Sequence, residues 1–431
     1  ATSVSAHDGE IILDAGPNGT VNARGTLDAS GRDSGETGGT VAITGHDVNI
    51  RNGAHIDASG NAGGGTVRIG GDFHGGRGLR QADSTTVARN AHINADALKS
   101  GHGGRVAVWS RDSTNFNGRI SAKGGRHGGN GGFIETSSGN DLHIGHSSFI
   151  RTTAYDGIVG TWLIDPGCNF VIADSGGNID PTTITTVLQT TNEVISTASS
   201  IVVEDPINYA SANNLALLSQ ANIDVGASIQ NTKASSGGGI YLIAGWDGTT
   251  GYDGTTLTPS LLTNSGVYGN GSGSVTVGGS NIGYSGFSQS SDIAVGSRSG
   301  TTTVAGHDIS VETRSENSFD SQIGYSGHTG GGDIVVDATG DVNVVLNSSS
   351  SGYAQIGNGA IGAQGIINAT GNITLNVDGS TTIDDTSGSG TAWIGNYAGE
   401  GGTVTGNLSI VTGNFFIDDD NLLGDMMKSM L

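Results

Sequence analysis

Apolar and polar residues alternate over short runs throughout the chain, for example at residues 41–43, 67–69 and 373–375. A period of two is typical of strands that bury one face. The runs end at glycine, asparagine or aspartate, which suit tight corners because they tolerate positive φ or bond back to the backbone. The pattern therefore predicts many short β-strands joined by sharp corners.

Four segments in the first third of the chain repeat one arrangement. Each has a short apolar strand, a polar corner and a glycine run that leads into another strand. Their equivalent apolar residues are Leu27, Ile56, Ile93 and Ile120. Such self-similarity indicates a stacked array, in which one unit buries its apolar face only when a neighbour covers it.

A second family of repeats lies downstream and is centred on Ile-Gly pairs. The pairs begin at Ile282, Ile323, Ile356 and Ile394, so their spacings are 41, 33 and 38 residues. We interpret each spacing as about two coils of a solenoid that uses roughly 20 residues per coil.

The composition also favours an all-β chain. With 77 glycines, 5 prolines and 13% charged residues, long amphipathic helices are excluded. Abundant Val, Ile, Thr and Ser favour short strands, and the regular alternation argues against low-complexity disorder. A solenoid grows without dividing into compact domains, so the 431 residues predict one elongated rod.

Charge is unevenly distributed along the chain. Residues 1–151 hold 14 basic and 14 acidic residues, which leaves 4 basic and 26 acidic residues beyond them, so the net charge of −22 belongs to the second part. An acidic surface repels nucleic acid and anionic membranes. We interpret the charge as a means of keeping an exposed rod soluble, with cation binding as the alternative.

Other features narrow the class of protein. No apolar stretch is long enough to cross a bilayer, so we expect no membrane insertion. The chain starts at Ala1 without an initiator methionine or signal segment, and we interpret it as a mature or trimmed piece. Its one cysteine, Cys168, excludes an internal disulfide and is expected to be a buried thiol.

One helix is expected near residues 180–190. Asp180 provides a capping carboxylate, and Pro181 suits the first helical position. Ile184, Val187 and Leu188 then share one face. We expect this helix to protrude from the rod or to cover its flank.

The region between the two repeat families contains two distinctive strings, GFIETS at residues 132–137 and TWLIDP at residues 161–166. Together with the flanking repeats, they resemble bacterial two-partner-secreted exoproteins of the filamentous haemagglutinin-like family, which includes high-molecular-weight adhesins. The residues that carry the resemblance are Phe133, Glu135, Thr136, Trp162, Leu163, Ile164, Asp165 and Pro166.

This resemblance implies a right-handed parallel β-helix that is exported across a Gram-negative outer membrane and displayed at the cell surface. The family's amino-terminal secretion domain, with its Asn-Pro-Asn signatures, is not visible here. The chain therefore resembles the passenger region, and recognition of the outer-membrane transporter is expected to belong to a region that this chain lacks.

We find no constellation that predicts catalysis. Asp28 and Asp57 recur at one repeat position, but Asn94 and Ser121 replace them in the next two copies, which suits a turn-facing polar site better than a carboxylate pair. No nucleophile elbow, phosphate loop or zinc motif is present. The sequence predicts neither an enzyme nor a cofactor.

Histidines gather in the first part of the chain, and His143 and His146 are three residues apart. In a strand context that spacing places them on opposite faces. No Cys/His cluster indicates a zinc site, and no methionine partner indicates haem. We therefore expect no metal site.

The last residues change in character. Residues 421–431 hold all three methionines and predict a short helix after the final strand. This helix would cap the end of the solenoid or dock one copy onto the next. The residues that it would bury in either case are Leu422, Leu423, Met426 and Leu431.

We divide the chain at this stage into a β-helix at 1–160, a junction module with the short helix at 161–232, an acidic β-helix at 233–416 and a tail at 417–431. The sequence predicts a secreted adhesin or fibre segment whose host receptor, a glycan or a protein, is not revealed. Two alternatives are a filament subunit that associates end to end and a β-helical polysaccharide-active enzyme.

Overall fold

A computed structural model describes residues 3–7, 9–248, 272–278, 291–313, 319–346, 352–360, 363–385 and 390–419. The described residues form two compact units. The first unit contains residues up to 199 together with 213–215, and the second contains residues 200–212 and the described residues from 216 onward. The division at 199/200 falls inside the predicted junction module of 161–232.

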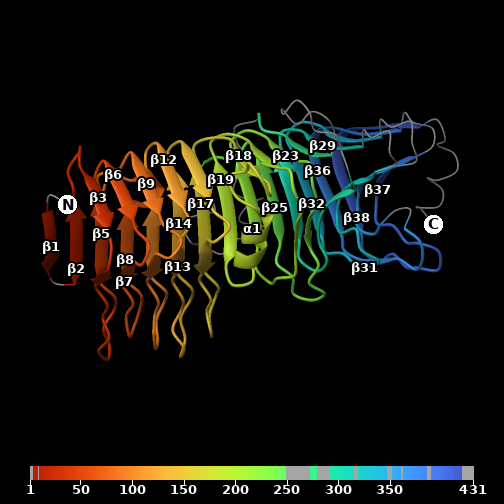
Figure 1. Cartoon of the computed structure of the whole chain (residues 1–431). Coiled ribbons are helices and arrows are strands. Elements are labelled where there is room, and N and C mark those ends of the chain that lie inside the picture. Colours follow the sequence, from red (N-terminus) through yellow and green to blue (C-terminus); the bar gives the residue numbers. More distant parts are fainter. Residues whose placement is uncertain are drawn as a thin grey trace. The chain divides into compact units, whose positions relative to one another are not determined.

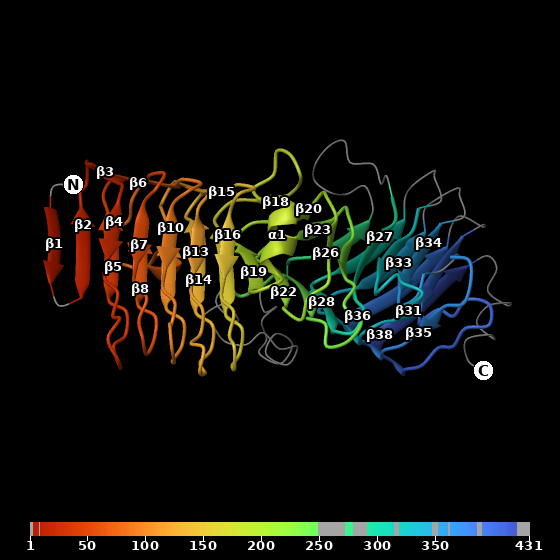
Figure 2. The ribbon, with the colours of Figure 1, turned by 60° about the horizontal axis from the view of Figure 1, so that its bottom comes forward.

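The first unit is a parallel β-helix with three sheets (Figures 1 and 2). Its first sheet contains β2 (Glu10–Asp14), β5 (Thr40–Thr44), β8 (Thr66–Ile69), β11 (Arg105–Val108), β14 (Phe133–Ser138), β17 (Thr161–Pro166) and β19 (Asn192–Thr197). The second contains β3 (Thr20–Ala23), β6 (Asp47–Ile50), β9 (Ser84–Val87), β12 (Ser113–Phe116) and β15 (Asp141–Ile144). The third contains β4 (Thr26–Asp28), β7 (His55–Asp57), β10 (His92–Asn94), β13 (Arg119–Ser121) and β16 (Phe149–Arg151).

Two further strands complete the description of this unit. β1 (Ser3–His7) pairs antiparallel with β2, whereas the pairings within the three sheets are parallel. β18 (Phe170–Ile172) follows β17 along the chain.

The repeats of the first third occupy one position in this fold, as the sequence predicts. Leu27, Ile56, Ile93 and Ile120 are direct partners along the third sheet. Ile56, Ile93 and Ile120 are buried. Alternate residues of each strand therefore build the core, and the others lie on the outer face.

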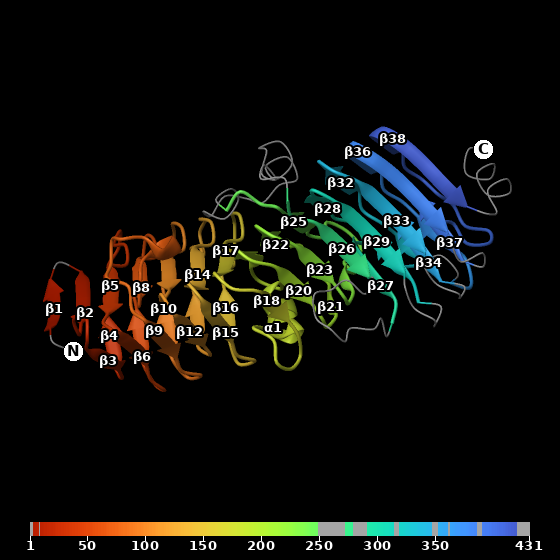
Figure 3. The same cartoon turned by 90° about the horizontal axis from the view of Figure 1, so that it is seen from above.

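The second unit is also built of parallel strands (Figure 3). One row contains β20 (Ile201–Val203), β23 (Ile223–Val225), β26 (Val275–Gly278), β29 (Ile309–Thr313) and β33 (Val342–Leu346). A second contains β22 (Leu215–Ser219), β25 (Ile240–Ala244), β28 (Thr302–Gly306) and β32 (Ile334–Ala338). A third contains β21 (Ile207–Tyr209), β24 (Ile229–Asn231), β27 (Ile293–Ser297), β30 (Ser321–Ile323), β34 (Tyr353–Ile356) and β37 (Thr391–Ile394).

The long strand β36 (Ile373–Asp385) joins the first two rows, because its first half pairs with β32 and its second half with β33. β38 (Leu408–Asp419) then pairs with β36. A small sheet contains β31 (Thr329–Gly330) and β35 (Asn368–Ala369). In β38 and just before it, Val404, Leu408, Val411, Phe415 and Phe416 are exposed.

The predicted coil length of roughly 20 residues is wrong for most coils. Ile323 pairs directly with Ile356, and Ile356 with Ile394, so 33 and 38 residues make one coil rather than two. A coil close to the expected length lies between Ile207 and Ile229. Most coils are longer because the corners carry extended loops, which a β-helix accepts at its surface without disturbing strand register. Ile282 lies outside the described residues.

Glycine columns explain the glycine runs that precede the strands of the first sheet. Gly39, Gly65, Gly104, Gly132 and Gly160 occupy the same position in successive coils, immediately before β5, β8, β11, β14 and β17. A Cβ atom on Gly132 would overlap the carbonyl oxygen of Gly104, and one on Gly160 would overlap that of Gly132. Only glycine lets the coils approach this closely.

The expected helix is present as α1 (Pro181–Val187). The Asp180 side chain accepts a hydrogen bond from the Thr183 backbone N–H at 2.9 Å, and Pro181 occupies the first turn. Ile184 and Val187 are buried, and the helix contacts β16 and β19. It therefore covers the flank of the first unit instead of protruding from it.

Three smaller expectations can be compared with the structure. Cys168 is partly exposed rather than buried, because it lies in the corner that follows β17. Among the described residues, no helix is long and apolar enough to cross a membrane. The predicted tail helix and its residues Leu422, Leu423, Met426 and Leu431 lie outside the described residues.

Candidate functional site

A groove of about 400 Å³ lies where three successive coils of the first unit enter β11, β14 and β17. Its lining residues are His102, Gly103, Arg105, Asn130, Gly131, Gly132, Phe133, Ile158, Val159 and Gly160. The size falls within the range of ligand-binding pockets, about 300–1,000 Å³. Because glycine has no side chain, backbone atoms form part of the wall of the groove.

Arg105 is the charged residue of this groove. It is the first residue of β11 and pairs with Phe133 of β14. Its guanidinium lies 4.3 Å from the centre of the Phe73 ring and 5.5 Å from that of the Phe133 ring. Two cation–π contacts hold the side chain in place while it stays exposed. Within the described part of the chain, Arg105 has no ion pair or hydrogen bond through its side chain.

Phe73 belongs to a loop that covers the outer face of the first sheet. The loop contains the short 3₁₀ helix η1 (Phe73–Gly75). The His74 backbone N–H donates to both carboxylate oxygens of Glu135, each at 3.0 Å. Gly75 has φ +63°, and a Cβ there would lie 2.8 Å from the Trp109 ring. The hydrogen bonds to Glu135 thus hold the loop against the sheet, and Gly75 lets it pack closely on Trp109.

The pKa of Glu135, which lies beneath this loop, is far from its ordinary value. Its side chain is fully buried, although it points from β14 toward the outer face. Burial raises the pKa of Glu135 to about 8; the neighbouring charge of Asp165 adds to the rise, and the His74 hydrogen bond opposes it. Burial also raises the pKa of Asp165 to about 6, against the hydrogen bond from Ser196. Neither carboxyl group lines the groove, and Glu135 has no surface that a ligand could reach.

A third acidic group of the first unit faces the core. Glu193 is in register with Trp162, and both of its carboxylate oxygens are buried without a hydrogen-bond partner in the described structure. Burial, followed by the charge of Asp180, raises its pKa well above the ordinary value. An unpaired buried charge is costly, so Glu193 is held in its neutral form.

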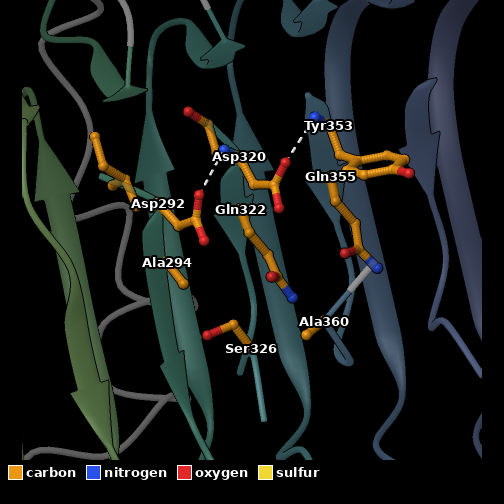
Figure 4. A pocket seen from close by; sticks show the side chains of 10 residues that line it. Asp292, Ala294, Asp320, Gln322, Ser326, Tyr353, Gln355 and Ala360 are labelled. Atoms are coloured by element: carbon orange, nitrogen blue, oxygen red, sulfur yellow. Dashed lines mark hydrogen bonds between the residues drawn. The ribbon is translucent and has the colours of Figure 1, made fainter. Parts of the chain in front are cut away.

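The second unit has a small pocket beside β27, β30 and β34 (Figure 4). Asp292 accepts a hydrogen bond from the Asp320 backbone N–H at 3.1 Å, and Asp320 accepts one from the Tyr353 backbone N–H at 2.9 Å. Burial raises the pKa of Asp320 to about 7, and the charge of Asp292 adds to the rise. Gln322 and Gln355 lie below this row in Figure 4.

The size of the pocket limits the ligands that Asp292 and Asp320 could bind. The pocket has a volume of about 80 Å³. A liquid water occupies about 30 Å³, so this space holds two or three waters. It is far below the roughly 300 Å³ of the smallest usual ligand pockets. The paired aspartates therefore lack room for a sugar ring.

The repeated aspartates behave as corner residues. Asp28 accepts from the Ser30 backbone N–H and Asp57 from that of Ser59, both at 2.9 Å. Asn94 accepts from the Asp96 N–H in the same way. These bonds agree with the turn-facing role that the sequence predicts.

The family-motif residues lie on two neighbouring strands. Phe133, Glu135 and Thr136 are on β14, and Trp162, Leu163, Ile164, Asp165 and Pro166 are on β17, which pairs with β14 in parallel. The Trp162 indole N–H donates to the Thr136 hydroxyl at 3.1 Å inside the core. Phe133 also lines the groove, so one structural residue of the motif contributes to it.

Several histidines in the structure contact aspartates, and one pair contacts each other, since the His55 and His92 rings stack with centres 5.0 Å apart. His146 contacts the Asp180 carboxylate at 3.0 Å, and His46 contacts Asp47 at 3.2 Å and Asp83 at 3.1 Å. Among the described residues, no group of three or more His, Cys, Asp or Glu side chains could hold a metal ion.

Sequence reasoning missed Arg105, Phe73 and Asn130. A signal was available at Arg105, because the residue that follows the glycine column is Thr40, Thr66, Arg105, Phe133 and Thr161 in successive coils. A charged residue at a position otherwise taken by threonine or phenylalanine marks an exception. Nothing in the sequence around Arg105 indicates that its side chain contacts Phe73, which lies 32 positions earlier.

No protein-family model matches this chain. No curated protein is significantly similar to it either. The residues and the fold are therefore the basis for assigning a function.

Proposed function

We propose that the chain is a ligand-binding segment of a secreted, surface-displayed adhesin of a Gram-negative bacterium. In this proposal the β-helical units are the passenger region of a two-partner-secretion exoprotein that an outer-membrane transporter exports. The resemblance of residues 132–137 and 161–166 to the filamentous haemagglutinin-like family supports this assignment, as does the parallel β-helical fold.

The observation that carries the proposal is the groove at Arg105. It combines a ligand-sized volume with an exposed guanidinium that lies over two aromatic rings and, within the described residues, forms no side-chain hydrogen bond or ion pair. The perturbed carboxyl groups of the first unit lie outside it, so the groove is equipped for binding rather than acid–base chemistry. Host glycans or proteins are the partners that such a surface would meet.

The test uses microbeads coated with the purified chain and beads coated with albumin. We expect the first to adhere to epithelial cells in a saturable way and free chain to displace them. A parallel assay follows the release of reducing sugar from cell-surface polysaccharide. Adherence no greater than that of albumin beads contradicts the proposal, and steady release of sugar supports an enzyme instead.

A filament subunit is the second candidate, because of the exposed apolar residues at β38. Phe416 is 54% exposed and Val411 is 65% exposed. Exposed apolar residues on a strand such as β38 favour association between copies of the chain. Sedimentation velocity over a wide concentration range distinguishes the two functions. Growing assemblies that Phe416→Ser abolishes would favour the filament, and one concentration-independent species would exclude it.

A further inference from the structure

The polar side chains that line the groove all present hydrogen-bond donors. His102 Nδ1 accepts the Asn130 backbone N–H at 2.9 Å, so a neutral ring carries its proton on Nε2. The Asn130 side-chain oxygen accepts from the Ile158 N–H at 3.0 Å, which leaves its NH₂ group. Arg105 adds the guanidinium. In the described structure, none of these three donor groups has a hydrogen-bond acceptor.

The groove also keeps an uncompensated positive charge. None of its lining residues is acidic. Glu135 interacts electrostatically with Arg105, and its pKa of about 8 means that it is mostly protonated at neutral pH. A guanidinium that is held by two rings and has five free N–H groups matches the planar, two-oxygen geometry of a carboxylate.

We propose that the groove binds an acidic sugar residue of a glycan, with Arg105 pairing with its carboxylate and with His102 and Asn130 donating to its hydroxyl oxygens. This inference rests on the proposed adhesin function and specifies the ligand of its groove.

The strand pairing favours a sugar over an acidic peptide. Extended peptides usually bind by adding a strand to an unpaired sheet edge. Here β11, β14 and β17 are each paired on both sides, so the groove offers no free backbone edge. A sugar needs no such edge, and its hydroxyl groups use donors spread over a glycine-lined floor.

The first experiment compares matched glycans on an array. Each carboxylated glycan is printed beside its carboxyl-reduced form, in which the acid is a primary alcohol, and acidic peptides are included. We expect the full chain to retain acidic glycans and to bind their reduced forms at least about tenfold more weakly, because the charge-assisted pair is lost. Equal binding of both forms, or retention of the peptides alone, would overturn the inference.

The second experiment uses matched arginine variants. Arg105→Met removes the charge but keeps an apolar stem over the rings. Arg119→Met is the control, because Arg119 is also exposed and also lies over a phenylalanine, at 5.7 Å from the Phe149 ring, but is outside the groove. We expect the dissociation constant for the best acidic glycan, measured by calorimetry, to rise at least about tenfold for Arg105→Met only.

Equal weakening by both variants would indicate general attraction to basic charge, and no weakening would place the ligand elsewhere; either result refutes the groove assignment. Thermal unfolding of each variant confirms that the fold is intact. If coated beads still adhere to cells while Arg105→Met binds glycans normally, the inference fails and the adhesin function stands. If beads do not adhere at all, the proposed function itself fails.

Discussion

The two β-helical units stabilise their corners in different ways. In the first unit, the two ends of a corner meet directly through backbone groups, as where the Gly104 N–H donates to the Ala95 carbonyl and the Gly132 N–H to that of Ala122, both at 2.7 Å. Aspartate and asparagine side chains also accept hydrogen bonds in these corners, as Asp28 does from the Ser30 N–H and Asn94 from the Asp96 N–H. Glycine columns make this close approach possible.

In the second unit, buried or partly buried amide side chains contribute to this role as well. The Asn358 NH₂ group donates to the carbonyls of Gly332 and Thr370, both at 2.9 Å. Gln355 donates to Gly395 at 2.9 Å, and Asn396 donates to Gly371 at 2.8 Å. Amides satisfy carbonyl groups without carrying charge.

The difference shows that the stability of one fold can depend on different kinds of contact in its two units. The corners of the first unit depend on the absence of side chains, and its strands bury Glu135 and Glu193, which titrate. The corners of the second unit depend on amides, which do not titrate. Gly332 and Gly357 of the second unit are also closely packed, and Asp320 there also titrates, so we expect both units to respond to added volume and to pH. The second unit should respond in addition to the loss of particular amide hydrogen bonds.

The largest expected effect comes from adding volume to a glycine column. Gly132→Ala would force a methyl group into the Gly104 carbonyl, and we expect the free energy of unfolding of the first unit to fall by about 3 kcal/mol. Hydrogen exchange, measured peptide by peptide, would show the loss in the first unit alone. Gly63→Ala is the control, because its Cβ would lie 3.4 Å from the Thr37 methyl group and should change stability by less than about 0.5 kcal/mol.

The next effect is a pH dependence that Glu135 gives to the first unit. The ordinary pKa of Glu135 is 4.5, and its folded value is about 8. Below pH 4.5 both folded and unfolded states are protonated; above it the unfolded state releases its proton first, so stability falls as pH rises toward 8 and then levels off. The slope due to Glu135 approaches about 1.4 kcal/mol per pH unit.

Glu135→Gln tests this dependence, because an amide keeps the shape without titrating. We expect unfolding curves between pH 5 and pH 8 to lose part of their slope in the variant, while Glu193 and Asp165 continue to contribute. A slope as steep in Glu135→Gln as in the unaltered chain would show that Glu135 is ionised in the folded protein.

A smaller effect is expected from removing an amide of the second unit. Asn358→Ala leaves the carbonyls of Gly332 and Thr370 without that donor, and it also removes the acceptor of the Tyr325 N–H. We expect a loss of about 2 kcal/mol in denaturant unfolding. The exposed Asn372→Ala should cost about 0.5 kcal/mol; equal losses would mean that burial of the amide is unimportant.

The smallest effect concerns a corner aspartate. Asp57→Asn removes an exposed ion pair with Arg32, which is 2.7 Å away, but keeps an acceptor for the Ser59 N–H. Exposed pairs contribute little, so thermal unfolding should change by less than about 0.5 kcal/mol. Asp57→Ala should cost about 1 kcal/mol, because the turn loses its acceptor. If both variants lost the same amount, the ion pair and not the turn would be responsible.

The sequence by itself determined the strand type and much of the register. Leu27, Ile56, Ile93 and Ile120 were predicted to be equivalent, and the structure pairs them directly. Alternation decides which face is buried, and a slip of one residue would expose that whole face, so a local pattern is sufficient. The helix after Asp180 was predictable for a similar reason, since its cap and its apolar face lie within nine residues.

Only the tertiary structure decided the coil length and the groove. Corner loops of different length leave the strand pattern unchanged, so the spacing of 33 residues between Ile323 and Ile356 did not reveal whether it held one coil or two. The loop that carries Phe73 and His74 is placed by bonds to Glu135, 61 residues from His74. Such contacts depend on which segments meet when the coils stack, because no periodic pattern along the chain encodes the partner of a loop that lies over the outer face.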